Sequence, residues 1–248
     1  MNPLNPREVR LLLALVALAL VPLLAPAVAQ ADDYTHYADL RSWLGIPHTL
    51  DVLSNLPFAV AGVWGLVALS RSAVASTQRL LAALFFVGLV VTAAASAWFH
   101  WQPDHAGLVA DRLGMTVAFA GVLGLGVAGQ VSARAGSLLA ALVLLAGPLT
   151  LSLWSTSGNL LPWAVLQGGG LLLLLVLAFV HPRPGALPVH WGALVAIYAV
   201  AKAFELADHA VFDATGQVIS GHSLKHLVAA GAAWPVIRAL PFVRQNQI

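Results

Sequence analysis

The feature that most constrains this chain is a series of long apolar stretches that carry almost no charge. Seven such stretches follow the first thirty residues, at approximately 51–70, 78–100, 107–130, 136–154, 160–180, 188–212 and 222–240. A helix needs about twenty apolar residues to cross the hydrocarbon core of a bilayer. Strands of a transmembrane barrel would alternate apolar and polar residues, which these runs do not do. The sequence therefore predicts an all-α polytopic membrane protein, a seven-transmembrane helix bundle.

The composition agrees with this prediction and excludes several classes of site. Apolar residues make up 60% of the 248 residues and charged residues only 9%, whereas soluble domains carry about a quarter charged residues. The chain has no cysteine, which excludes disulfides, thiolate metal sites, iron–sulfur clusters and a cysteine nucleophile. The 12 Lys and Arg residues are spread along the chain and form no basic stripe, so nothing supports nucleic-acid binding.

The N-terminal segment has the layout of a secretory signal peptide. Two arginines precede an apolar run at 11–24, and the small-x-small sequence Ala-Val-Ala follows at 27–29. The run is short and prolines interrupt it, which favours a cleaved signal over an eighth transmembrane helix. We expect 1–29 to be a signal peptide or an N-terminal transmembrane helix, and 30–248 to form one seven-transmembrane domain.

The charges in the loops predict the orientation of this domain. Every second loop and the C-terminal tail carry arginines, which are Arg71, Arg79, Arg134, Arg183, Arg238 and Arg244. The intervening loops carry mainly aspartates, with Arg41 as the exception; they are Asp32, Asp33, Asp39, Asp104, Asp208 and Asp213. An excess of Lys and Arg in short loops marks the cytoplasmic side. The sequence thus places the C-terminus inside and the aspartate-rich loops outside.

Several polar side chains interrupt the predicted spans, nearly all of them toward the outer side. They are Ser96, His100, Asp111, Glu205, Asp208, His209, His222, Lys225 and His226. Ionisable side chains inside a membrane are costly, and each is a functional candidate by default. Solubility gives no reason for them to gather at one depth, whereas a shared site does.

The spacing of these residues predicts a metal site. His222 and His226 are four residues apart, so both imidazoles leave one helix face on consecutive turns. With His100 they supply three nitrogen donors, the set of a catalytic zinc that keeps its fourth position for water. Zinc lowers the pKa of that water to about 7, and Asp111 could accept its proton. Ser96 lies one turn before His100, on the same face.

The motifs as a set resemble those of one family. They are Ser-Ala-Trp-Phe-His at 96–100, Asp111, Gly-His-Ser-Leu-Lys-His at 221–226, and Ser-Asn at 54–55. In this order and spacing, from about 37 to 234, the chain resembles the alkaline ceramidases, within a superfamily that includes the adiponectin-receptor-type membrane hydrolases. The resemblance implies a zinc-dependent hydrolase of linear amide C–N bonds, which cleaves ceramide or a related N-acyl lipid to a fatty acid and a sphingoid base or other amine.

The resemblance also implies roles for individual residues. The three histidines would hold the zinc, Asp111 would orient and deprotonate the water, and Ser96 would stabilise the oxyanion. From the residues alone, Glu205 and Asp208 are candidates to hold a ligand imidazole, although both also suit a solvated helix end.

Calcium is a cofactor that the resemblance leaves open. Eukaryotic alkaline ceramidases bind it through a Trp- and Glu-containing N-terminal segment and a Glu before the Ser-Asn pair. The stretch 33–39 lacks that pattern, and His48 stands near the position of that Glu. Oxygen ligands for Ca²⁺ are still available from Asp32, Asp33, Asp39 and Asp51.

The signal-like segment and the Ala-, Leu- and Val-rich helices suggest a bacterial member, in the inner membrane with its site facing the periplasm. Its substrate could then be an N-acyl lipid other than ceramide. Three other functions remain open: a non-enzymatic seven-helix lipid-binding receptor with a structural zinc, a metal or proton transporter, and a haem-binding electron carrier. A transporter would spread ionisable residues through the membrane depth, and haem would colour the protein.

Overall fold

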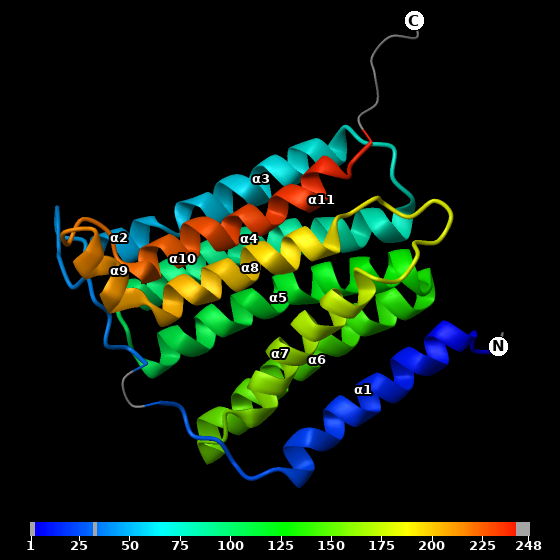
Figure 1. Ribbon diagram of the computed structural model, residues 1–248, viewed down its shortest axis with the longest axis horizontal. Coiled ribbons are helices and arrows are strands. Elements are labelled where there is room, and N and C mark those ends of the chain that lie inside the picture. Colours follow the sequence, from blue (N-terminus) through cyan, green and yellow to red (C-terminus); the bar gives the residue numbers. More distant parts are fainter. Residues whose placement is uncertain (1–2, 32–33, 242–248) are drawn as a thin grey trace, which may run out of the picture.

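The computed structural model describes residues 3–31 and 34–241, and this part of the chain folds into helices and loops without a β-strand (Figure 1). The helices are α1 (Pro6–Leu24), α2 (Thr49–Leu53), α3 (Leu56–Ser70), α4 (Ser76–Trp101), α5 (His105–Gln130), α6 (Ala133–Ser157), α7 (Leu161–Leu177), α8 (Trp191–Leu206), α9 (Asp208–Ala214), α10 (Gly221–Ala230), the 3₁₀ turn η1 (Gly231–Ala233) and α11 (Trp234–Arg238). The predicted all-α class is confirmed.

Four helices in the described residues are long and apolar enough to cross a membrane. They are Thr49–Ser70, which joins α2 and α3, and Ser76–Trp101, His105–Gln130 and Ala133–Ser157. The other three predicted spans are shorter or interrupted. The helix α7 has 17 residues, a kink at Ala207 separates α8 from α9, and η1 separates α10 from α11. A membrane protein is therefore indicated by four helices.

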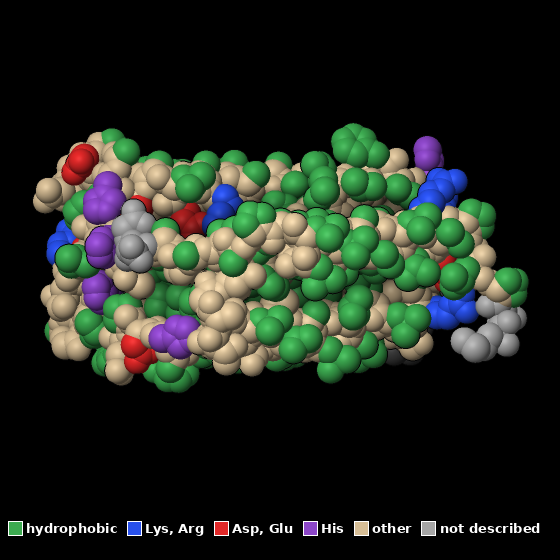
Figure 2. Space-filling view, turned by 90° about the horizontal axis from the view of Figure 1, so that it is seen from below, with side chains coloured by type: hydrophobic (Ala, Val, Ile, Leu, Met, Phe, Trp, Pro, Cys, Tyr) green, Lys and Arg blue, Asp and Glu red, His purple; other side chains and the backbone are tan. Residues whose placement is uncertain are grey.

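The distribution of apolar and charged side chains over the surface also fits a membrane protein. Figure 2 shows a broad apolar middle, with most histidines and charged side chains gathered toward the two ends of the bundle. Leucines of the middle that remain exposed include Leu138, Leu145 and Leu149, each more than half exposed. Lipid chains would cover such side chains in a bilayer.

The N-terminal helix α1 packs along the bundle beside α7 (Figure 1). A Cβ added at Gly169 of α7 would lie 3.0 Å from Leu18, so the two helices approach closely. At the start of α1, Glu8 accepts hydrogen bonds from Ser132 at 2.6 Å and Arg134 at 2.8 Å. The segment predicted to be a signal peptide therefore makes specific contacts with the rest of the fold.

Close packing of α4 against α5 fixes the centre of the bundle and depends on glycine. A Cβ at Gly88 would lie 2.3 Å from the backbone nitrogen of Ala118, and one at Gly121 would lie 2.2 Å from that of Phe85. Small residues at helix interfaces let backbones approach in this way in membrane proteins. Since α4 carries His100 and α5 carries Asp111, this contact sets the relative position of two predicted site residues.

Substitution of Gly121 by alanine is expected to lower the thermal stability of the purified protein. The added methyl group would meet the Phe85 backbone, and overpacking of this kind costs about 1–3 kcal/mol. We expect the apparent Tm to fall by several degrees. Gly168→Ala in α7 is the matched control, because a Cβ there meets nothing within 4 Å. Equal melting of the two variants would contradict the described packing.

Candidate metal centre

The helix α10 presents two of the candidate ligands. Ser220 caps its N-terminus by accepting a hydrogen bond from the Ser223 backbone at 3.0 Å. The backbone N–H of His222 in the first turn donates to Asp208 at 2.7 Å, which ties α10 to α9. His222 and His226 follow on one face and are both buried. The cap and the Asp208 contact therefore fix the start of α10 and, with it, the positions of the two histidines.

A glycine lets α10 start directly against α8. A Cβ at Gly221 would lie 2.3 Å from the carbonyl oxygen of Phe204, so any side chain would push the start of α10 away. This close approach places the first turn of α10, which carries His222, against the end of α8 that carries Glu205.

The structure brings His100, at the end of α4, to the pair on α10. The Nε2 atoms of His100 and His222 are 3.2 Å apart, and the three rings have centroids 4.8 to 5.0 Å from one another. One ligand atom from each histidine lies within 4.8 Å of the other two. Zinc–nitrogen bonds of about 2 Å separate two nitrogen ligands by about 3.3 Å in tetrahedral geometry. The buried triad could therefore hold a metal ion.

A hydrogen bond joins the hydroxyl of Ser54 to the ring of His226. The hydroxyl of Ser54 donates to the backbone carbonyl of Asp51 at 3.0 Å and lies 2.8 Å from Nδ1 of His226. In the tautomer that carries its proton on Nδ1, His226 donates to the Ser54 hydroxyl. Its Nε2 is then unprotonated and free to bind a metal, the arrangement that most histidine ligands use. Spacing gave no sign of this pair, which is 172 residues apart.

A segment between α1 and α2 covers the triad. The ring of Tyr37 packs edge-on against His222 and His100, with centroid distances of 4.5 and 5.1 Å. The backbone N–H of Ala38 donates to Asp208 at 2.9 Å, so the same carboxylate holds both this segment and α10. The triad is consequently closed on this side.

Asp39 and Asp51 are the two candidate calcium ligands in the described residues, and each accepts hydrogen bonds from other side chains. Burial alone would raise the pKa of Asp39, but two hydrogen bonds and the charge of Arg41 outweigh it and hold that pKa below its usual value. Asp51 accepts a hydrogen bond from an α10 serine at 2.6 Å. The pair at 32–33 lies outside the described residues. Among the described residues, the three histidines are the one group of three or more His, Asp or Glu side chains whose ligand atoms lie close enough to share a metal ion.

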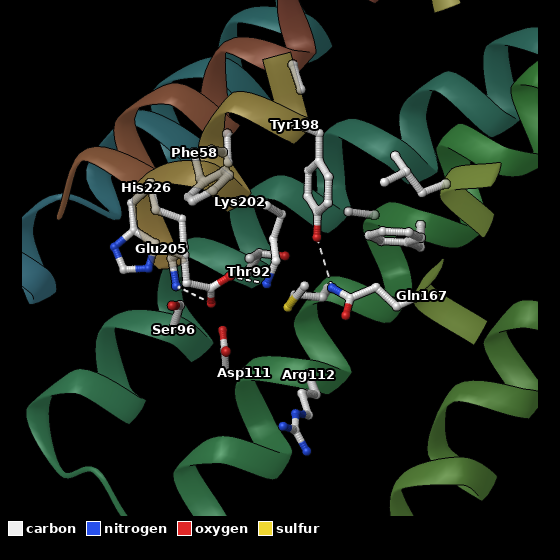
Figure 3. Close-up of a pocket in the computed structure, with 18 of the residues that line it drawn as sticks. Phe58, Thr92, Ser96, Asp111, Arg112, Gln167, Tyr198, Lys202, Glu205 and His226 are labelled. Carbon is white, nitrogen blue, oxygen red and sulfur yellow. Dashed lines mark hydrogen bonds and ion pairs between the residues drawn. The ribbon is translucent and has the colours of Figure 1, made fainter. Parts of the chain in front are cut away.

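A cavity of about 320 Å³ opens beside the triad and extends between the helices. Most of its wall is apolar, and its polar lining is uneven (Figure 3). Toward one end lie Ser96, Asp111, Glu205 and His226, with Lys225 3.5 Å from Glu205. Farther along, Gln167 donates a hydrogen bond to Tyr198 at 2.9 Å. The two residues predicted to be catalytic, Ser96 and Asp111, thus share a cavity with a triad histidine.

Glu205 and Asp208 have partners other than a ligand imidazole. Glu205 pairs with Lys202 and lies 3.5 Å from Lys225. Asp208 accepts the backbone N–H of His222, as described above. The sequence left both open, as partners of a ligand imidazole or as parts of a solvated helix end, and the hydrogen bonds described for them come from lysines and from backbone N–H groups.

Lys225 is the group that crowds the triad most directly. Its Nζ lies 3.0 Å from Nε2 of His222, the nitrogen that a metal would use, and its side chain is 18% exposed. A lysine here repels a cation at the triad, and Glu205 offsets this only in part.

Substitution of Lys225 by methionine is therefore expected to tighten zinc binding by about tenfold, equivalent to about 1.4 kcal/mol. Competition with a zinc-chelating dye measures this affinity. Lys202→Met is the matched control, because Lys202 pairs with the same Glu205 but has no described contact with a triad histidine. Weaker zinc binding in Lys225→Met would show that the lysine supports the site.

Comparison of the chain with models of protein families gives no match, and comparison with curated proteins gives none either.

Proposed function

We propose that this protein is a zinc-dependent hydrolase that cleaves the amide bond of an N-acyl lipid, such as ceramide, within the membrane. The observation that carries the proposal is the buried triad His100, His222 and His226 at the edge of a largely apolar cavity that Ser96 and Asp111 also line. The site of a zinc hydrolase needs metal ligands, a proton acceptor and room for the substrate, and these residues supply all three.

The donor set suits a catalytic zinc. Three histidine nitrogens leave a fourth position for water, whereas structural zinc sites fill all four positions with protein. Zinc supplies Lewis acidity toward the amide carbonyl and lowers the pKa of water to about 7. The hydrogen bond between Nδ1 of His226 and the hydroxyl of Ser54 holds this ring in place beside the other two histidines.

The residues of the cavity supply the proton transfers. Asp111 takes a proton from the attacking water and returns it to the departing amine nitrogen, as a general base and then a general acid. The hydroxyl of Ser96, which is 3% exposed, donates a hydrogen bond to the oxygen that becomes negatively charged. The fatty acid and the amine are then the two products.

The apolar part of the cavity defines the substrate class. Its wall includes side chains such as Phe85, Leu89, Phe119 and Leu174. Such a wall takes up an alkyl chain, while a few polar groups at one end orient the amphiphile. An amide bond at the junction of chain and head group would lie next to Asp111.

For the architecture, we propose that all seven predicted spans cross a bacterial inner membrane and that the triad lies toward the periplasmic side. The arginine-rich loops support this orientation. The contacts of Glu8 with Ser132 and Arg134 support retention of α1 as an eighth helix over cleavage of a signal peptide. The intact mass of the purified protein tests this last point.

Mass spectrometry of reaction products tests the function. Purified, zinc-loaded protein is incubated with a panel of N-acyl lipids, and we expect fatty acid and free amine in equal amounts. Treatment with a chelator should stop the reaction, and added zinc should restore it. A zinc-containing protein that releases no product from any amide would instead favour a lipid-binding receptor.

A further inference from the structure

Arg112 is a buried cation in the cavity that the proposed chemistry does not use. It follows Asp111 on α5, is 4% exposed, and lines the same cavity (Figure 3). Its Nη2 donates a hydrogen bond to the side-chain oxygen of Gln30, and its buried Nη1 has no hydrogen-bond partner. Buried donors nearly always have a partner in native structures, so this one requires an explanation.

Aromatic rings surround the guanidinium but leave its donor unsatisfied. Its carbon lies 4.3 Å from the ring centroid of Trp154, 5.5 Å from that of Tyr34 and 6.0 Å from that of Trp163. Rings at these distances stabilise the positive charge. Rings offer no oxygen acceptor, however, so Nη1 remains without a partner.

Arg112 differs from the two lysines of the cavity in its ion-pair partners. Lys202 and Lys225 share Glu205 as an anionic partner. Among the residues that the structure describes, no carboxylate lies within ion-pair distance of Arg112. A planar guanidinium binds carboxylate or phosphate through two parallel hydrogen bonds. A carboxylate or phosphate that entered the cavity would supply the partner that Nη1 lacks.

The position of Arg112 indicates which part of a ligand would supply that anion. It lies about two turns into α5, toward the end of the bundle that holds the triad. Gln30 and Tyr34, which flank the guanidinium, belong to the loop that follows α1. A lipid whose chain occupies the apolar part of the cavity would have its head group at this end.

We propose that Arg112 and Gln30 form a subsite for an anionic oxygen group, a carboxylate or a phosphate, on the head of the amphiphile. This inference rests on the proposed function for its substrate and narrows the class to N-acyl lipids with an anionic head group, which ceramide itself lacks. The cation determines specificity and takes no part in the cleavage of the amide.

Binding of simple amphiphiles tests the subsite independently of hydrolysis. Tetradecyl phosphate, myristate and tetradecanol have the same chain, differ in the head group and contain no amide bond. Affinities for the purified, zinc-loaded full chain are measured by native mass spectrometry. We expect at least one of the two anions to bind about tenfold tighter than the alcohol. The tighter anion identifies phosphate or carboxylate as the natural group.

Variants separate recognition of the anion from a structural role of the arginine. Arg112→Gln is expected to bind all three amphiphiles with similar affinity, and Arg112→Lys to keep part of the preference. Arg238→Gln, an exposed arginine outside the cavity, is the control that should behave like the wild type. Two results overturn the proposal: equal affinities in the wild type, which requires no variant to fold, or an undiminished preference for the anion in Arg112→Gln.

Discussion

His222→Ala is expected to lose bound zinc, of which the proposed function requires one ion per wild-type chain. The substitution removes one of three nitrogen donors and leaves His100 and His226 to hold the ion with two. Loss of an outer partner of a ligand costs about 10–100-fold in metal affinity, and loss of the ligand itself should cost more. Zinc content after dialysis, measured by elemental mass spectrometry, should fall to background, and amide hydrolysis should fall with it.

Two further variants make this result specific. His181→Ala removes an exposed histidine outside the triad and should retain full zinc. Ser54→Ala removes the hydroxyl that pairs with His226 and should weaken zinc binding by about 10–100-fold without abolishing it. Full zinc in His222→Ala would refute the assignment of the ligands. Equal zinc affinity in Ser54→Ala and the wild type would show that Ser54 does not orient His226.

Local patterns in the sequence were sufficient for the class of the fold. Apolar runs of about twenty residues predict helices; three of the predicted spans are single long helices, and a fourth joins α2 and α3. The same patterns could not show that η1 interrupts the last span or that Ala207 separates α8 from α9. Such breaks depend on how a segment packs against neighbours such as α3 and α10, which an apolar run does not specify.

The candidate site was predictable where one helix carries the signal. The four-residue spacing of His222 and His226 identifies one face of a helix, and the shared depth of His100 suggested the third histidine. Partners from distant segments left no such signal. Ser54 was noted only for the family motif it resembles, and the sequence reasoning did not single out Arg112, because its lack of a partner is visible only when the surrounding helices are in place.

Substitution of Asp111 by asparagine is expected to abolish hydrolysis while zinc stays bound. Asparagine has nearly the same shape but cannot take a proton from the attacking water. Loss of a general acid or base typically costs about 10²–10⁴-fold in rate. We expect this loss in kcat, with little change in KM, because the cavity wall that holds the lipid is unaltered. Asp213→Asn, an exposed aspartate outside the cavity, should retain full activity.

The zinc content of Asp111→Asn decides between the enzyme and the receptor with a structural zinc. A structural ion has four protein ligands, and Asp111 would then have to be the fourth beside the three histidines. In that case the variant would release zinc as His222→Ala does. In an enzyme the fourth position belongs to water, so inactive protein with its zinc retained is the expected result. The same aspartate therefore distinguishes the two functions by whether its loss removes the metal or only the proton transfer.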